Sequence, residues 1–254
     1  MMALTLGGAL VSCSDFDEVN TDPMATGGDK VKPYYALSNS IIASQMNPDI
    51  GERLFVIEWA AAARQDGEDG YNTSGGTTHD DYYSAAYSNI SNWLRDANTA
   101  INLLENKQGT WTVHEEEFYP NLLQMARIWR VQMMSQFVDN FGPAPLNAFQ
   151  GENPTYNSEK EAYYWMLAEL ADAVGKINTS VEPNDAEKKC DPAYGFNATN
   201  WKNYGISLRM RLAMRLSEAD PAKAKSEFEA AVQQGSGITT TEGTFRVQEY
   251  PGWD

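Results

Sequence analysis

The sequence Leu10-Val11-Ser12-Cys13 is the first place where residue types and spacing indicate chemistry. An apolar run that starts at Met1 leads into a small residue and then a cysteine, which is the order of a bacterial lipobox. The run is too short to cross a bilayer as a helix, which takes about 20 residues. We therefore predict that residues 1–12 are a removed signal peptide and that a diacyl-type lipid on Cys13 anchors the mature chain.

An alternative interpretation of the N-terminus stays open. No Lys or Arg precedes the apolar run, although an export signal normally carries positive charge there. The run would then be a buried N-terminal helix and Cys13 an ordinary core residue. Cys190 is the only other cysteine, so a lipid on Cys13 would exclude an intramolecular disulfide and leave Cys190 as a free thiol in a turn.

A second stretch, Asp66 to Trp93, has the residue types that sugar recognition needs. Flat aromatic rings stack on the apolar faces of sugars, while amides and carboxylates hydrogen-bond to hydroxyl groups. The stretch is rich in glycine at its start, which predicts an exposed loop. Our candidate ligand-binding residues are Asp66, Asp69, Tyr71, Asn72, Tyr82 and Tyr83. The alternative is that Tyr83, Tyr87 and Trp93 lie close to a helix start and belong to the core.

Other reactive patterns do not support an enzyme or a metal site. The sequence has no Gly-x-Ser-x-Gly elbow, phosphate loop or dinucleotide fingerprint. His79 and His114 are far apart and are not joined by cysteines at zinc-ligand spacing. The acids around Asp66 do not fall at EF-hand positions. We predict no catalytic residue, no metal and no cofactor.

Two charged runs have a simpler structural interpretation. Glu115-Glu116-Glu117 point to different sides of a helix, so they cannot flank one scissile bond, and they suit the N-terminus of a helix. Arg209, Arg211 and Arg215 offer an anion site in principle. Such residues are more often partners in salt bridges, and we expect acids such as Glu218 to pair with them.

Composition describes a folded, acidic protein. The 254 residues are 42% hydrophobic and include seven Trp and thirteen Tyr, which is typical of a globular chain. The formal net charge of -16 repels nucleic-acid backbones and anionic lipid headgroups. Neutral or cationic ligands are therefore expected, and membrane attachment has to come from the lipid.

The order of apolar residues predicts helices along nearly the whole chain after an extended tether over residues 13–32. Ser158 and Glu161 form a capping-box pattern at the start of one helix, and Asp220-Pro221 starts another. Trp59, Trp129 and Trp201 fall on apolar stripes and should be core. The other predicted helices are Pro33–Gln45, Arg53–Arg64, Tyr87–Asn106, Glu115–Phe141 and Asn200–Ser217.

The fold class is therefore predicted as all-α, with one helical domain over residues 33–254. The last two helices form a hairpin of the tetratricopeptide kind, in which Ala213 and Ala231 allow close helix contact. A regular 34-residue repeat is absent, so we expect a degenerate array of helical hairpins. The only candidate strand is Thr244 to Val247.

Several segments taken together resemble the SusD/RagB family of outer-membrane nutrient-binding lipoproteins. They are Cys13 to Pro23, Tyr156 to Ile177 and the arginine-rich block Ser207 to Ser217. The stretch Phe137 to Leu146, with Asp139, Gly142 and Pro145, is similar to an aspartate-glycine-proline turn of that family. The resemblance covers nearly the whole chain.

The resemblance implies a helical fold with tetratricopeptide-like hairpins and a position on the outer face of the outer membrane. It implies partnership with a SusC-like TonB-dependent barrel, over which the lipoprotein closes as a lid. Asp15, Asp17 and Glu18 are similar to the signal that sends such lipoproteins to the cell surface. Members of the family usually continue well past a point such as Asp254, so we expect an N-terminal portion whose ligand-binding surface is incomplete.

The expected function is thus binding of a nutrient and its delivery to the barrel transporter, with no covalent chemistry. The expected ligand is an oligosaccharide, and a peptide is the alternative ligand. Two other classes stay open. One is a lipid-anchored helical adaptor that binds only proteins, and the other is an accessory part of a glycan or peptide hydrolase whose catalytic part lies elsewhere. Glycan titration separates the adaptor from the receptor, and turnover of an oligosaccharide would indicate the enzyme.

Overall fold

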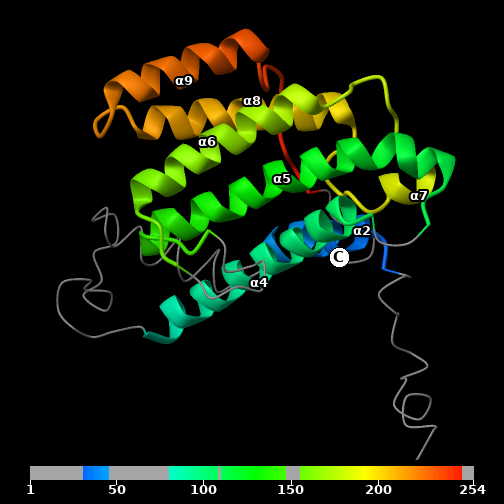
Figure 1. The fold of residues 1–254 in the computed structure, drawn as a ribbon, viewed down its shortest axis with the longest axis horizontal. Helices are drawn as coiled ribbons and strands as arrows, with labels where there is room; N and C mark the ends of the chain where they lie inside the picture. The colour runs from blue at the N-terminus through cyan, green and yellow to red at the C-terminus, as the bar shows by residue number, and fades with distance from the viewer. Residues whose placement is uncertain (1–30, 46–79, 108–109, 147–154, 248–254) are drawn as a thin grey trace, which may run out of the picture. The chain divides into compact units, whose positions relative to one another are not determined.

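A computed structural model of the chain describes residues 31–45, 80–107, 110–146 and 155–247, with side chains from Ser84 onward in the second range. These elements belong to one compact unit, Lys32–Asp254. The predicted all-α class is confirmed: the described elements are all helices (Figure 1). They are α2 (Pro33–Gln45), α4 (Asp80–Glu105), α5 (Val113–Phe141), α6 (Glu159–Lys176), α7 (Asp185–Lys188), α8 (Ala198–Arg215) and α9 (Pro221–Gln234).

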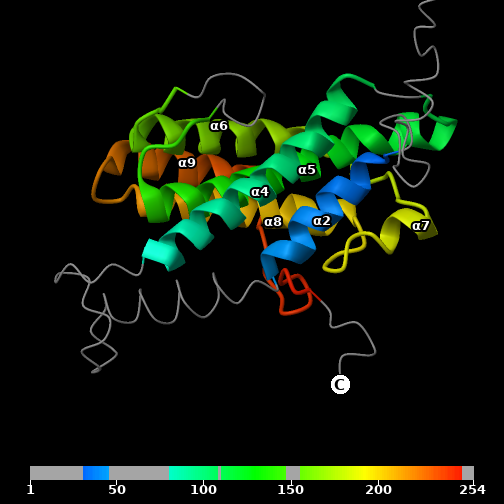
Figure 2. The same ribbon diagram turned by 90° about the horizontal axis from the view of Figure 1, so that it is seen from below.

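The helices pack mainly on their neighbours in the chain. α2 lies along α4, α4 packs on α5, α5 on α6, α6 on α8, and α8 on α9 (Figure 2). The α8–α9 pair is the predicted tetratricopeptide-like hairpin, and Ala213 and Ala231 are fully buried. The predicted helix Arg53–Arg64 lies outside the described residues. Within the described residues, no helix combines the length and the apolar composition that a membrane span requires.

Helix ends follow local rules that the sequence already shows. Ser158 accepts a hydrogen bond from the Glu161 backbone and Glu161 returns one, which confirms the predicted capping box of α6. Asp220 caps α9 with Pro221 in its first turn, again as predicted. Thr112 and Glu115 form a further capping box at α5. α5 ends at Phe141, and its C-cap Gly142 has a φ of +79°, a conformation that favours glycine.

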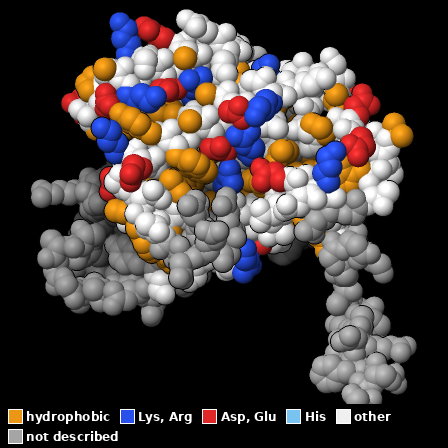
Figure 3. Space-filling view, in the orientation of Figure 1, with side chains coloured by type: hydrophobic (Ala, Val, Ile, Leu, Met, Phe, Trp, Pro, Cys, Tyr) orange, Lys and Arg blue, Asp and Glu red, His pale blue; other side chains and the backbone are white. Residues whose placement is uncertain are grey.

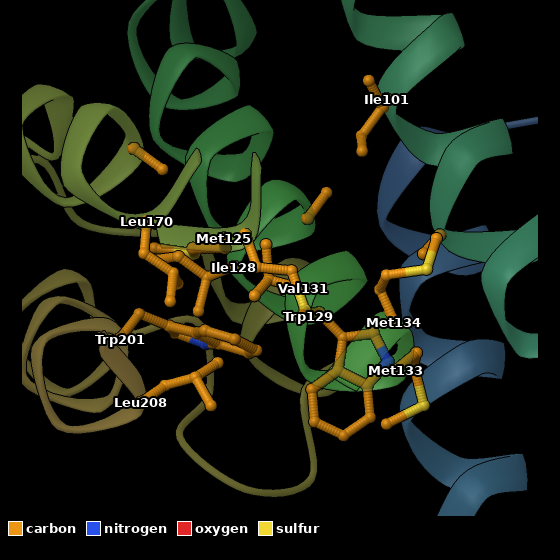
Figure 4. Close-up of a cluster of buried hydrophobic side chains, with 14 of the residues drawn as sticks. Ile101, Met125, Ile128, Trp129, Val131, Met133, Met134, Leu170, Trp201 and Leu208 are labelled. Atoms are coloured by element: carbon orange, nitrogen blue, oxygen red, sulfur yellow. The ribbon is translucent and has the colours of Figure 1, made fainter. Parts of the chain in front are cut away.

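The core lies on both sides of α5. Trp129 and Trp201 are buried, as predicted, with ring centroids 6.4 Å apart at 84° (Figure 4). In the same view the side chain of Ile128 lies near Leu170 and Trp201. On the α2 side, the Trp129 Nε1–H donates to Ser40 Oγ at 2.9 Å, and the Ser40 hydroxyl donates to the carbonyl of Trp93 at 2.8 Å. This link joins α2, α4 and α5.

The expectation of a strand at Thr244–Val247 is wrong. The segment is irregular, and among the described residues the single β-bridge is the antiparallel pair Ala144–Asn157. Phe245 instead stacks on Trp129 at 5.3 Å and contacts the rings of Tyr194, Trp201 and Tyr204. The partly buried ring of Phe245 therefore packs on the aromatic core, and the segment pairs with no strand among the described residues.

Candidate functional site

Most of the predicted site residues lie outside the described structure. This holds for the lipidation candidate Cys13 and for Asp66, Asp69, Tyr71 and Asn72. Tyr82 and Tyr83 belong to the first turn of α4, but their side chains also lie outside the described part. The ligand-binding role of these residues therefore remains a prediction. What the structure describes is the helix that follows the predicted loop.

Tyr87 and Tyr156, which we call the tyrosine pair, form an exposed aromatic edge next to this region. Tyr87 lies on α4 and is 39% exposed, while Tyr156 precedes α6 and is 57% exposed. Their hydroxyl oxygens are 3.3 Å apart. The alternative that Tyr87 is a core residue is therefore wrong. Trp93, in contrast, is buried, as that alternative expected.

Both tyrosines are held in place by the C-terminal end of α5 and the turn that follows it. The ring of Tyr87 lies 5.1 Å from that of Phe137 and 5.3 Å from that of Phe141. Tyr156 directly precedes Asn157, whose backbone exchanges two hydrogen bonds with Ala144 at 2.9 and 3.1 Å. The capping box of α6 begins at the next residue. The aromatic edge is therefore positioned by a rigid scaffold.

The chemistry of the tyrosine pair suits a ligand with hydroxyl groups and apolar faces. Each ring has an exposed apolar surface, and each hydroxyl can donate and accept a hydrogen bond. The hydrogen bond with Tyr156, together with burial, raises the pKa of Tyr87. Tyr87 thus stays a neutral phenol at physiological pH.

Sequence reasoning included Tyr87 in the candidate stretch but missed Tyr156. Tyr156 stands in a polar link, and its partner lies 69 residues away, so no local pattern connects the two. The one available signal was its position just before the capping box at Ser158, which predicts a fixed backbone next to an exposed link.

Two residues of the arginine trio form salt bridges between helices, as predicted, and Arg211 forms a hydrogen bond between helices instead. Arg209 donates to Glu227 through Nε at 2.9 Å, and Arg215 lies 2.9 Å from Asp139. Arg211 donates to the side-chain oxygen of Gln132 at 2.7 Å. The expected acid, Glu218, is replaced by Glu227 and Asp139, because these acids face α8 from α9 and α5.

The acid run at α5 also has a structural role. Glu115 is buried and accepts hydrogen bonds from Lys32 Nζ at 2.7 Å and from the Tyr119 hydroxyl at 2.8 Å, whereas Glu116 is exposed. Trp111, before the helix, packs edge-on against Tyr119 at 5.0 Å. The described residues contain no group of three His, Cys, Asp or Glu side chains that could hold a metal ion.

Charged side chains on the face that carries α5 and α6 also pair with each other (Figure 3). Arg127 and Arg130 both contact Glu169, at 2.9 and 2.6 Å, and Arg127 also contacts Asp172 at 2.6 Å. Positive and negative side chains alternate in this network. It therefore offers no single-sign surface for a charged polymer.

Comparison with known proteins identifies relatives of this fold. A family model, SusD-like, described as Susd and RagB outer membrane lipoprotein, matches residues 42–251. A solved SusD homologue from Parabacteroides distasonis is 27% identical with a TM-score of 0.68, over 80% of this chain and 39% of that one. No curated protein sequence matches the chain.

Two further solved structures are similar in fold. A chitin-binding protein is 22% identical with a TM-score of 0.67, over 80% of this chain and 43% of that one. A chitin-binding SusD homologue from Flavobacterium johnsoniae is 22% identical with a TM-score of 0.56, over 82% of this chain and 45% of that one. The chain thus spans less than half the length of these solved relatives.

Proposed function

The chain belongs to the SusD-like family of outer-membrane lipoproteins, and from this premise we propose that it is a cell-surface receptor for a nutrient. The ligand is an oligosaccharide, which the receptor delivers to a SusC-like TonB-dependent barrel in the outer membrane. Binding uses ring stacking and hydrogen bonds, with no covalent step and no cofactor. The match of the family model is the observation that carries this proposal.

The tyrosine pair supports a sugar as the ligand. Two exposed rings with hydroxyl groups 3.3 Å apart present the combination of apolar surface and hydrogen-bonding groups that a sugar ring uses. The predicted residues Asp66, Asp69, Tyr71, Asn72, Tyr82 and Tyr83 precede Tyr87 in the chain and would extend the same site. Two similar structures are chitin-binding proteins by name, so chito-oligosaccharides are the first ligands to test.

The proposed membrane attachment is a lipid on Cys13 after removal of residues 1–12. Residues 13–32 then form a tether, and residues 33–254 form the helical domain. Asp15, Asp17 and Glu18 would direct the lipoprotein to the outer face of the membrane. A net charge of -16 gives no electrostatic attraction to anionic lipids, which makes the lipid necessary.

Calorimetric titration of the mature protein with neutral oligosaccharides and with peptides tests the ligand class. We expect Tyr87→Ala and Tyr156→Ala to weaken binding of the preferred oligosaccharide several-fold each. Tyr35→Ala is the matched control, because Tyr35 is 55% exposed on α2 and is outside the proposed site.

Three outcomes would contradict the proposal. Absence of sugar binding at millimolar concentration would favour a protein adaptor. Binding of peptides alone would replace the ligand class, and turnover of the oligosaccharide would indicate a hydrolase.

For the partner, detergent extraction of native membranes followed by affinity purification should recover a SusC-like barrel with the lipoprotein, and its absence would contradict the delivery role.

A further inference from the structure

A cleft of about 850 Å³ opens beside the tyrosine pair, among α5, α6 and the turn between α8 and α9. Its volume is in the range of small-molecule binding sites, about 300–1,000 Å³. One part of the lining is apolar and includes Val138, Phe141, Pro143 and Leu216. The rest is polar and is built by residues that already contact each other.

A network of three side chains forms the polar part near α5. Asp139 accepts hydrogen bonds at Oδ1 from the Tyr163 hydroxyl at 2.6 Å and from Arg215 at 2.9 Å. Arg215 Nε also donates to the Tyr163 oxygen at 2.8 Å. Burial, reinforced by Asp139, raises the pKa of Tyr163 to about 12, so Tyr163 keeps its proton.

This network leaves two hydrogen-bonding groups available. Among the described residues, Asp139 Oδ2 and Arg215 Nη1 have no partner, and the Arg215 side chain is 48% exposed. A carboxylate oxygen accepts from one hydroxyl group, and a guanidinium N–H donates to a neighbouring one. Adjacent hydroxyl groups on a sugar ring match this arrangement, and the apolar lining would contact the C–H face of the same ring.

The charges of the lining favour an uncharged ligand. Asp139, Glu159 and Asp220 provide negative charge, while Lys160 and Arg215 provide positive charge. A ligand with a charge of either sign would meet like charges. Asp220 already accepts a hydrogen bond from Tyr164, so this part of the lining is held in place as well.

Phe141 connects the cleft to the tyrosine pair. Phe141 lines the cleft, and its ring lies 5.3 Å from the ring of Tyr87. We propose that the cleft is a second sugar subsite, which holds uncharged units of an oligosaccharide whose other units lie on the tyrosine pair. This inference rests on the proposed function and adds a position for a longer glycan.

Blocking the cleft tests this subsite without removing its hydrogen bonds. Ala219 is exposed and lines the cleft, so Ala219→Trp would fill the opening. Ser217→Trp is the control, because Ser217 is exposed in the same turn but does not line this cleft. We expect Ala219→Trp to weaken binding of a neutral hexasaccharide about 10-fold in calorimetry, a loss of about 1.4 kcal/mol. Ser217→Trp should leave the affinity unchanged.

The outcomes separate the two proposals. If the unmodified protein binds no oligosaccharide, the proposed function fails and the subsite fails with it. If the unmodified protein and Ala219→Trp bind the hexasaccharide equally, only the subsite is wrong. If the unmodified protein binds peptides alone, and Ala219→Trp abolishes this binding, the assignment of the cleft to a sugar is wrong.

A second measurement avoids dependence on the folding of the tryptophan variant. In hydrogen exchange of the unmodified protein, the hexasaccharide should protect amides of Gly142 and of the turn at residues 216–220. Protection confined to the surroundings of Tyr87 and Tyr156 would contradict the proposal.

Discussion

Gly205 of α8 lies so close to Val174 of α6 that a Cβ atom at position 205 would stand 2.7 Å from Val174 Cγ2. The same atom would stand 2.9 Å from Ile128 Cδ1 of α5. Three helices therefore meet at a residue without a side chain. Interiors are packed densely, so a methyl group has no free volume here.

Gly205→Ala should consequently destabilise the fold. Alanine is favoured over glycine inside a helix by about 1 kcal/mol, but overpacking of a core costs about 1–3 kcal/mol. We expect a net loss of about 1 kcal/mol in the free energy of urea unfolding. Gly175→Ala is the matched control, because its Cβ would meet nothing closer than Gln234 Nε2 at 3.8 Å. If Gly205→Ala and Gly175→Ala have equal unfolding free energies, the three helices move apart easily to admit the methyl group, and the prediction is wrong.

The buried carboxyl of Glu115 predicts a dependence of stability on acid pH. Burial alone would raise its pKa, but hydrogen bonds from Lys32, Thr112 and Tyr119 lower the pKa from 4.5 to about 2. A carboxyl with a depressed pKa in the folded state stabilises the fold above its unfolded pKa, and this contribution is lost as the pH falls toward 2.

Urea unfolding at several pH values between about 5 and 2 measures this effect. Glu115→Gln should be less stable than the unmodified protein at pH 5, and the difference should shrink as the pH falls. Glu116→Gln is the control, since Glu116 is exposed in the same helical turn. If the unfolding free energy of Glu115→Gln depends on pH in the same way as that of the unmodified protein, the lowered pKa of the Glu115 carboxyl would be contradicted.

The ion pair between Arg209 and Glu227 should be important for the α8–α9 hairpin. The two side chains are 7% and 13% exposed, and Glu227 also accepts a hydrogen bond from Lys223 at 2.7 Å. Removing one partner of a buried pair leaves an uncompensated charge and costs about 3–5 kcal/mol. We expect a loss of this size in the unfolding free energy of Glu227→Ala. Gln132→Ala, which removes the partner of the exposed Arg211, should cost less than about 1 kcal/mol.

Cys13→Ser should release the protein from the membrane. A serine cannot form the thioether of a lipoprotein, so the variant should leave the detergent phase in phase partitioning, and mass spectrometry should find no added lipid. Cys190→Ser is the control, because it removes the other cysteine of the sequence and leaves the proposed anchor at Cys13 intact. The Cys190 thiol is half-buried and donates to the carbonyl of Ala186 at 3.4 Å. Retention of Cys13→Ser in the membrane fraction would contradict the proposed anchor.

Local features of the fold could be predicted from the sequence. The helix over Pro33–Gln45 has the predicted bounds, and the capping residues Ser158 and Asp220 are where the pattern placed them. The burial of Trp129 and Trp201 follows from helical periodicity. Each of these features depends on residues within a few positions of each other, so a single segment contains all the information that determines it.

The candidate site depended on contacts between distant segments. The tyrosine pair joins residues 69 positions apart, and Asp139 of α5 takes the place of Glu218 as partner of Arg215. The sequence by itself determined the longer described helices, the caps at Ser158 and Asp220 and the all-α class, because backbone hydrogen bonds and apolar periodicity are local. Only the tertiary structure decided which tyrosines are exposed together and which acid faces which arginine, because those contacts depend on how the helices pack.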